Sequence, residues 1–83
     1  MFEPKDAEQV LMLLDDALKV YRKDKRAEKI VKYFLSLALS IVLKVDEEYN
    51  TGYRDYYDIL AAEYKKLKKV WEVRRWRSLF GLL

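Results

Sequence analysis

YFLSLALSIVLKV, residues 33–45, decides how this chain folds. Its three clearly polar residues belong to a longer set that recurs every three or four positions, and so lies on one narrow side of a helix: Lys25, Lys29, Lys32, Ser36, Ser40, Lys44 and Glu48. The other sides are apolar and must be buried from water against other apolar groups. A membrane span needs about 20 apolar residues, whereas a run of about 10 to 14 is typical of a buried core helix. The stretch therefore predicts a core helix over about residues 27–48, and membrane insertion is not expected.

Two further helices flank this one. The chain has a single proline, Pro4, and glycines only at positions 52 and 81, so few residues interrupt helical structure. Pro4 is suited to the first position of a helix. The apolar residues after it repeat at i, i+3, i+4 and i+7, which predicts an amphipathic first helix: Ala7, Val10, Leu11, Leu14, Ala17, Leu18 and Tyr21. The run RKDKR, residues 22–26, is the expected break, with Asp24 able to cap the second helix.

The third helix is expected to begin near Tyr53, because Asn50 and Gly52 both tolerate the positive φ that ends a helix. Its apolar residues have a 4-3-4-3-4 spacing, which is typical of helix-on-helix packing: Tyr53, Tyr57, Leu60, Tyr64, Leu67 and Trp71. Beyond Trp71 the same spacing reaches Arg74 and Ser78, whereas the apolar residues are Trp76, Leu79, Phe80 and Leu83. The apolar side thus changes near residue 74, and the end of the chain should pack on something else.

These patterns predict an all-α fold with one domain over residues 1–83, a three-helix bundle whose third helix is long and basic. A helix of about 25 to 30 residues spans roughly 40 Å, well beyond a first helix of about 18 residues. Helices of such unequal length cannot cover one another. A chain this short buries a modest share of its surface, and it has no cysteine for a disulfide. We therefore expect a two-fold homodimer through the exposed parts of helices two and three.

Composition also limits the chemistry. The chain has neither histidine nor cysteine, so the usual general base, a thiolate nucleophile and a Cys/His zinc site are excluded. Asp55 and Asp58 share a helical side and could hold Mg²⁺, but two carboxylates provide too few ligands. We expect no catalysis, no metal and no cofactor. Lys/Glu-rich, cysteine-free usage resembles that of hyperthermophile proteins, and no secretory leader pattern is visible, so a cytoplasmic protein is expected.

The strongest local signal is KKLKKVWEVRRWR, residues 65–77, hereafter the basic segment. It carries seven positive charges and one negative charge among five apolar residues. Basic residues interleaved with aromatic ones suit a helix that neutralises phosphates and stacks on bases. No helix-turn-helix pattern accompanies it, so we expect contacts mainly to the phosphates of DNA or RNA. The predicted nucleic-acid contacts are Lys65, Lys66, Lys68, Lys69, Arg74, Arg75, Arg77 and Trp76.

Two alternatives to this interpretation stay open on the sequence alone. The same composition describes an amphipathic helix at a membrane surface, and a charge run is often only a solvated side of a helix. A second group of aromatic residues, the tyrosines at 49, 53, 56 and 57, could form a stacking platform or pack in the core. Spacing favours the core for Tyr53 and Tyr57, and the surface for Tyr56.

The last eight residues, WRSLFGLL, are similar to the C-terminal peptide by which many archaeal replication and repair proteins bind the sliding clamp. That peptide has a glutamine, an aliphatic anchor and two aromatic residues at fixed spacing. Leu79 stands at the anchor, Leu82 and Leu83 at the aromatic positions, and Trp76 at the glutamine. The resemblance implies a protein partner, with Trp71, Leu79, Phe80, Leu82 and Leu83 as the expected contacts. The competing expectation is that Leu79, Phe80 and Leu83 fold back as a plug on the bundle.

Overall fold

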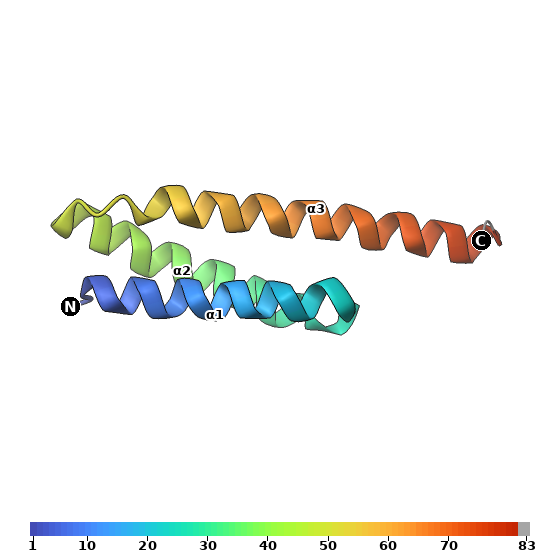
Figure 1. Cartoon of the computed structure of the whole chain (residues 1–83), viewed down its shortest axis with the longest axis horizontal. Coiled ribbons are helices and arrows are strands. Elements are labelled where there is room, and N and C mark those ends of the chain that lie inside the picture. The colour runs from blue at the N-terminus through green and yellow to red at the C-terminus, as the bar shows by residue number, and fades with distance from the viewer. Residues whose placement is uncertain (82–83) are drawn as a thin grey trace.

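A computed structural model describes residues 1–81, apart from the side chain of Phe80. Within that range the chain forms α1 (Pro4–Lys23), a short 3₁₀ turn η1 (Lys25–Ala27), α2 (Glu28–Tyr49) and α3 (Tyr53–Phe80), with no strand (Figure 1). The all-α prediction is confirmed. Each helix begins and ends within about two residues of the predicted position, because the caps and breakers stand where the sequence shows them.

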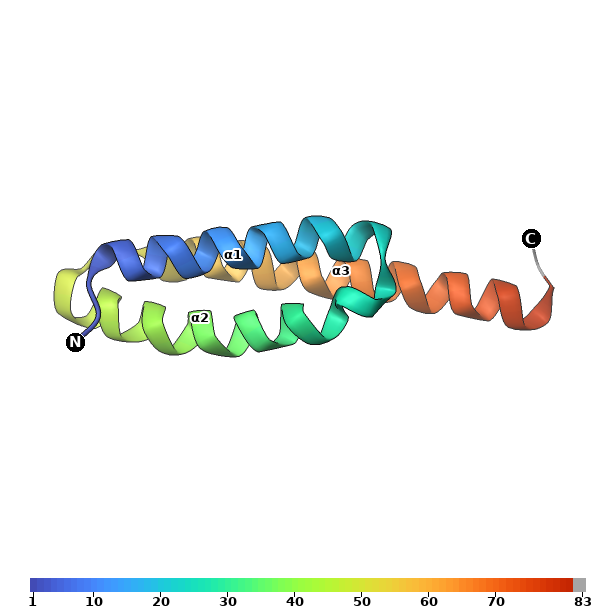
Figure 2. The same ribbon diagram turned by 90° about the horizontal axis from the view of Figure 1, so that it is seen from below.

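The three helices run up, down and up along one axis. α1 and α2 form an antiparallel hairpin, and α3 lies along one side of it (Figure 1 and Figure 2). α3 has 28 residues, against 20 in α1 and 22 in α2. It therefore runs past the end of the hairpin, and the molecule measures 52 × 17 × 14 Å.

The core is built from the apolar stripe of α1. All seven residues predicted for that stripe are buried, from Ala7 to Tyr21. α2 contributes Val31, Ala38, Ile41, Val42 and Val45, and α3 contributes Tyr57 and Leu60. None of the polar or charged residues described in 1–81 is buried, so the core is held by apolar packing, with polar groups at its edge.

The chain breaks between α1 and α2 where predicted, but Asp24 caps the short turn η1 and not α2, which begins after Ala27 without a side-chain cap. The Oδ1 of Asp24 accepts a hydrogen bond from the backbone N–H of Arg26 at 2.9 Å, and the Arg26 guanidinium bonds the same carboxylate. The side chain thus satisfies a donor at the start of the next helical turn. Three residues of η1 are enough to reverse the chain, so α1 and α2 stay in antiparallel contact along their length.

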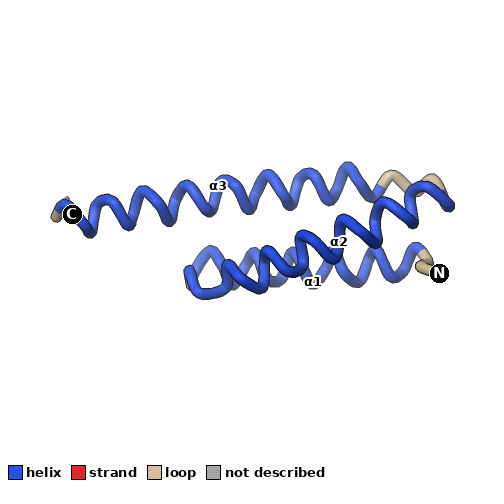
Figure 3. The backbone as a smooth tube through the Cα atoms, turned by 180° about the vertical axis from the view of Figure 1, so that it is seen from behind, coloured by secondary structure: helices blue, strands red, loops and turns tan. Residues whose placement is uncertain are grey.

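The α2–α3 connection, drawn in tan in Figure 3, is ordered by a single carboxylate. Asn50 and Gly52 adopt positive φ values of 53° and 76°, as predicted. Asp46 accepts hydrogen bonds from the backbone N–H groups of Tyr53 at 2.9 Å and Arg54 at 2.8 Å, and from the hydroxyl of Thr51. One side chain at the end of α2 therefore caps the first turn of α3 and sets its direction.

These hydrogen bonds change the acidity of Asp46. Partial burial by itself would raise the pKa, but the bonds from Thr51 and from the backbone N–H groups of Arg54, Tyr53 and Gly52 favour the ionised form. Together they outweigh the burial, and the pKa of Asp46 lies below its ordinary value.

One prediction about α2 fails within the protomer. Its non-polar sides do not all face a dry surface: Val31 and Val42 are fully buried, whereas Ile30 is 50% and Tyr33 62% exposed. The expected fold-back of the chain end also does not occur at Leu79. α3 continues as helix through Phe80, and Leu79 stays 68% exposed. Leu82, Leu83 and the Phe80 side chain lie outside the described residues.

Truncation of the α1 stripe should unfold the protein more readily than truncation of a neighbouring exposed residue. Leu14 is fully buried, and Met12 is 65% exposed on the same helix. We expect Leu14→Ala to lower the free energy of unfolding by about 2–5 kcal/mol, because it leaves a cavity in the core. Met12→Ala should change it by less than about 1 kcal/mol. Urea unfolding followed by circular dichroism measures both, and equal losses would contradict the assigned core.

Removal of the Asp46 carboxylate should destabilise the protein in a pH-dependent way. We expect Asp46→Ala to cost about 1 kcal/mol at neutral pH, as for other capping residues. Because the pKa of Asp46 is lowered on folding, its contribution is complete above about pH 4 and is lost as the pH falls through the folded-state pKa. The difference between wild type and variant should therefore shrink at lower pH. The matched control is Glu47→Ala, an exposed neighbour, and a deficit that stays constant down to about pH 2 would contradict the role of the charge.

Candidate nucleic-acid interface

The basic segment is anchored to the hairpin by three aromatic residues. Tyr21 of α1 lies 5.9 Å from Tyr64 and 6.4 Å from Trp71, measured between ring centroids. The indole Nε1–H of Trp71 donates a hydrogen bond to the backbone oxygen of Tyr21 at 2.9 Å. This bond occupies a carbonyl in the last turn of α1 that the helix leaves without a partner. α3 is thereby fixed to the hairpin at Trp71.

Polar contacts beside the aromatic residues hold α3 in the same register. The hydroxyl of Tyr64 donates to Oε2 of Glu28 at 2.8 Å, and Arg22 pairs with Glu63 at 2.7 Å. Burial, followed by the hydrogen bond to Glu28, raises the pKa of Tyr64, and burial also raises the pKa of Tyr21. Both phenols thus stay neutral at ordinary pH, so Tyr64 remains a donor to Glu28.

After Trp71, α3 projects alone. Figure 1 and Figure 2 show its last turns extending beyond the η1 end of the hairpin. The nine residues from 72 to 80 correspond to about 14 Å of helix. Beyond Glu72 and Arg75, which still lie beside Lys25 and Glu28 at the end of the hairpin, nothing else in the described chain covers this end.

The cations of the basic segment surround α3 instead of forming one stripe. Consecutive residues in a helix are about 100° apart, so Lys69, Arg74 and Arg75 point to three different sides. All seven lysine and arginine side chains are exposed, and none makes an ion pair with a described residue. Arg74 lies over the ring of Trp71, with 4.8 Å from its Cζ to the centroid. The positive charge of the segment is therefore not neutralised by any described carboxylate.

Apolar residues lie between these cations on the side opposite the seam. Val70 is 44%, Val73 51% and Trp76 57% exposed, which confirms the predicted change of side near residue 74. Val70 and Val73 form the floor of a shallow hollow of about 280 Å³, whose other lining residues are Lys69, Arg74 and Arg77. The surface can thus offer apolar contact and positive charge at the same place.

The tyrosine group near the α2–α3 turn is not a stacking platform. Tyr57 is buried in the core, and Tyr53 is partly buried, with its hydroxyl donating to Glu8 at 2.7 Å. Tyr56, predicted to lie outside, is 43% exposed. The prediction from spacing is therefore confirmed for Tyr53, Tyr56 and Tyr57.

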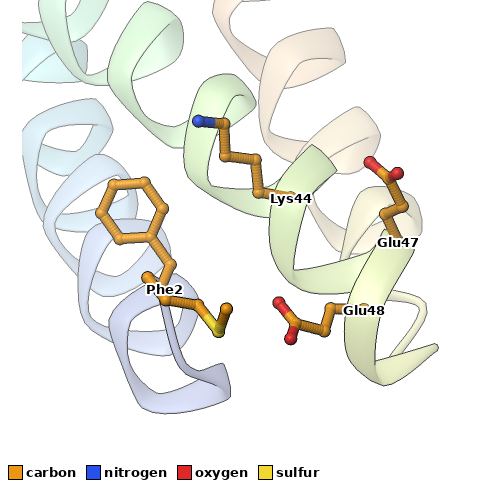
Figure 4. Close-up of a pocket in the computed structure, with 5 residues that line it drawn as sticks. Phe2, Lys44, Glu47 and Glu48 are labelled. Carbon is orange, nitrogen blue, oxygen red and sulfur yellow. The ribbon is translucent and has the colours of Figure 1, made fainter.

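Other candidate sites on the described chain are weaker. Asp58 accepts from Arg54 at 3.0 Å, and Asp15 pairs with Lys19 at 3.5 Å. No group of three or more acidic side chains in residues 1–81 could hold a metal ion. A hollow of about 580 Å³ lies at the far end between α1 and α2 (Figure 4), where Glu48 turns toward Phe2 and Glu47 turns away. Its lining residues are Met1, Phe2, Lys44, Glu47 and Glu48.

Sequence reasoning found the charged residues of the site but missed its support. The seven cations and Trp76 lie on α3 between residues 65 and 77, from the middle of the helix outward. Trp71, predicted as a partner contact, packs on Tyr21 within the protomer. Nothing in the sequence beyond its place in the α1 stripe indicated that Tyr21 supports the site. Its contact, Trp71, lies 50 residues further along the chain.

Comparison of the chain with known protein families, curated proteins and solved structures finds no match. Among residues 1–81, no helix combines the length and apolar character that crossing a membrane requires. The function therefore has to be inferred from the geometry of α3.

Proposed function

We propose that the protein is a non-catalytic nucleic-acid-binding protein that docks through the basic segment of α3, mainly on phosphates. The observation that carries this proposal is a set of seven cations without ion-pair partners in the described chain. The four lysines lie where α3 still packs on the hairpin, and the three arginines lie on the turns that extend beyond it (Figure 1). A solvated surface helix usually intersperses both signs of charge. Here only Glu72 interrupts the positive charge between residues 65 and 77.

Cations on several sides suit a helix that lies in a groove. The major groove of B-DNA is about 12 Å wide and admits one α-helix, with a phosphate backbone along each wall. A helix in that position needs positive charge on both flanks, and Lys66 and Arg75 point to opposite flanks of α3. The major groove of duplex RNA is too narrow for this arrangement, so the geometry favours duplex DNA.

The apolar residues between the cations add contact without strong base selection. Val73 and Trp76 have no amide or carboxylate with which to read the hydrogen-bonding edges of bases. They can pack against thymine methyl groups or partly unstack a base step. We propose that affinity comes largely from phosphates and that sequence preference is weak.

We propose further that the protein acts as a homodimer. A compact domain of this length has a radius of gyration of about 12 Å, and this protomer has 15.1 Å. This elongated shape supports the proposal, because it leaves more surface exposed than a compact domain does, and symmetric dimers are the commonest closed assembly.

DNA binding should depend steeply on salt, and two arginines should account for part of that dependence. We expect the double variant Arg75→Gln/Arg77→Gln to bind a duplex roughly tenfold more weakly at about 0.1 M salt. The slope of log affinity against log salt should also fall in magnitude by about two, because two counterions fewer are released. Fluorescence anisotropy with a labelled duplex at several salt concentrations measures both values.

The matched control is Lys5→Gln/Lys44→Gln, which removes the same net charge at the other end of the molecule. Its affinity should stay within about twofold of wild type, and its salt slope within about 0.5 of the wild-type slope. Equal losses in the two variants would mean that only net charge matters. No association of the wild type with DNA or RNA at low salt would end the proposal.

A protein partner at the end of α3 is the second candidate, favoured by the 68% exposure of Leu79 on the projecting helix. If the resemblance of the last eight residues reflects function, the protein should bind a purified archaeal sliding clamp. Leu79→Ala should abolish that complex, since Leu79 stands at the aliphatic anchor, while DNA affinity is retained. Calorimetric titration tests this, and absence of binding by the wild type would remove the candidate.

A further inference from the structure

The hairpin carries an exposed apolar surface on the side away from α3, which we name the hairpin face. It comprises Leu13 and Val20 of α1 with Ile30, Tyr33 and Leu37 of α2. Their exposed fractions run from 37% for Leu37 to 62% for Tyr33. In Figure 2 the hairpin lies toward the viewer and α3 behind it, so that view looks onto this side.

The contacts of α3 show on which side of the hairpin these five residues lie. α3 bonds Glu8 and Arg22 on α1, and Glu28 on α2. Since a helix turns by about 100° per residue, Leu13 and Val20 lie roughly 120–180° around α1 from Glu8 and Arg22. Ile30, Tyr33 and Leu37 lie roughly 140–200° around α2 from Glu28. The five side chains therefore share one side of the hairpin, and α3 is on the other.

The short turn between α1 and α2 determines which residues of the two helices lie side by side, at the same height along the helix axis. In an antiparallel pair, residues equally far from the turn lie side by side. This rule holds at the open end, where Phe2 and Glu48 line the same hollow (Figure 4). It places Leu13 beside Leu37, and Val20 beside Ile30, with Tyr33 between the two levels. The hairpin face thus presents an aliphatic pair from α1 and α2 at each of two levels.

The area of the protomer indicates how much of this surface a neighbour must cover. A compact monomer of 10.0 kDa exposes about 5,200 Å², whereas this protomer exposes 6240 Å². The excess is roughly 1,000 Å², close to the area of about 800 Å² that each partner buries in a standard interface. Part of this excess belongs to the turns of α3 that extend beyond the hairpin, so it is an upper limit on the area that a neighbour covers at the hairpin face.

We infer that the hairpin face is the interface between two copies of this chain, related by a two-fold axis that runs parallel to the helices. This inference rests on the homodimer of the proposed function and names its surface. α1 of one copy then lies on α2 of the other, so Leu13 meets the partner's Leu37 and Val20 meets the partner's Ile30. The result is an antiparallel four-helix layer with one α3 on each outer side.

The charge of Asp16 favours an axis parallel to the helices over an axis across them. An axis across the helices would place Asp16 of one copy against the same residue of the other, and facing like charges are unfavourable. The parallel axis instead places Asp16 beside the partner's Lys29 and Tyr33, where a carboxylate finds a cation and a hydroxyl donor.

This arrangement differs from the sequence-based expectation, which placed the interface on helices two and three. It leaves both copies of the basic segment uncovered, and both project from the same end of the dimer. A dimer built in this way presents two cationic helices to DNA together, which raises the effective concentration of the second contact.

The first experiment measures molecular mass by light scattering. The wild type should be a dimer at micromolar concentration, and Leu37→Glu should be a monomer, because it places two charges inside the interface. The control is Leu43→Glu on the opposite flank of α2, where Leu43 is 46% exposed; this variant should stay dimeric. Circular dichroism checks that both variants remain helical, and a misfolded Leu37→Glu is replaced by Leu37→Ser with the same expected loss of mass.

The second experiment tests the axis and does not depend on weakened folding. The chain has no cysteine, so Leu13→Cys and Leu37→Cys variants each carry one thiol. Mixed and oxidised, they should form a covalent dimer of mixed composition, whereas Leu13→Cys with Leu43→Cys should not.

A monomeric wild type, or equal masses for Leu37→Glu and Leu43→Glu, overturns the inference. Cross-linking of Leu37→Cys only with Ile30→Cys overturns the axis. A monomer that still binds DNA with a steep salt dependence would end this inference and leave the proposed nucleic-acid binding standing. A dimer that does not bind DNA would end the proposed nucleic-acid binding and leave this inference standing.

Discussion

The seam between α3 and the hairpin is the contact on which the rest of the structure depends. Its apolar residues keep a spacing of three and four from Tyr53 to Trp71, and the hairpin is long enough to cover them only that far. At Trp71 the seam closes with an aromatic contact and a hydrogen bond to the last turn of α1. The turns of α3 after Trp71 have neither a partner helix nor the seam spacing, so they extend into solvent.

Charge also changes along α3, from residue 65 onward. Where α3 packs on the hairpin, its polar groups pair across the helices, as Glu63 does with Arg22 and Tyr64 with Glu28. In the basic segment the cations surround the helix and have no described ion-pair partner. A rigid helix that presents charge on several sides fits between two phosphate walls better than it fits a flat surface. The fold thus separates a part that stabilises the protein from a part suited to binding.

The apolar surface is divided in a similar way. The α1 stripe makes the core, and the α2–α3 turn, ordered by Asp46, directs α3 along one side of the hairpin. α3 can cover only that side, so Leu13, Val20 and the outer residues of α2 stay exposed. The proposed pairing through the hairpin would cover this exposed apolar surface while leaving α3 accessible.

The sequence by itself determined the local structure of this protein. Helix starts and ends, the αL residues at Asn50 and Gly52, the buried stripe of α1 and the charged residues of α3 could all be predicted, because they depend on backbone preferences and short-range spacing. Tertiary structure alone decided which side of α2 is buried, since the helix is apolar on several sides and spacing does not say where its neighbours lie. It also decided the role of Trp71 and the extension of Leu79 into solvent. These features depend on contacts between residues far apart in the chain, and on the relative lengths of packed helices, neither of which a local pattern encodes.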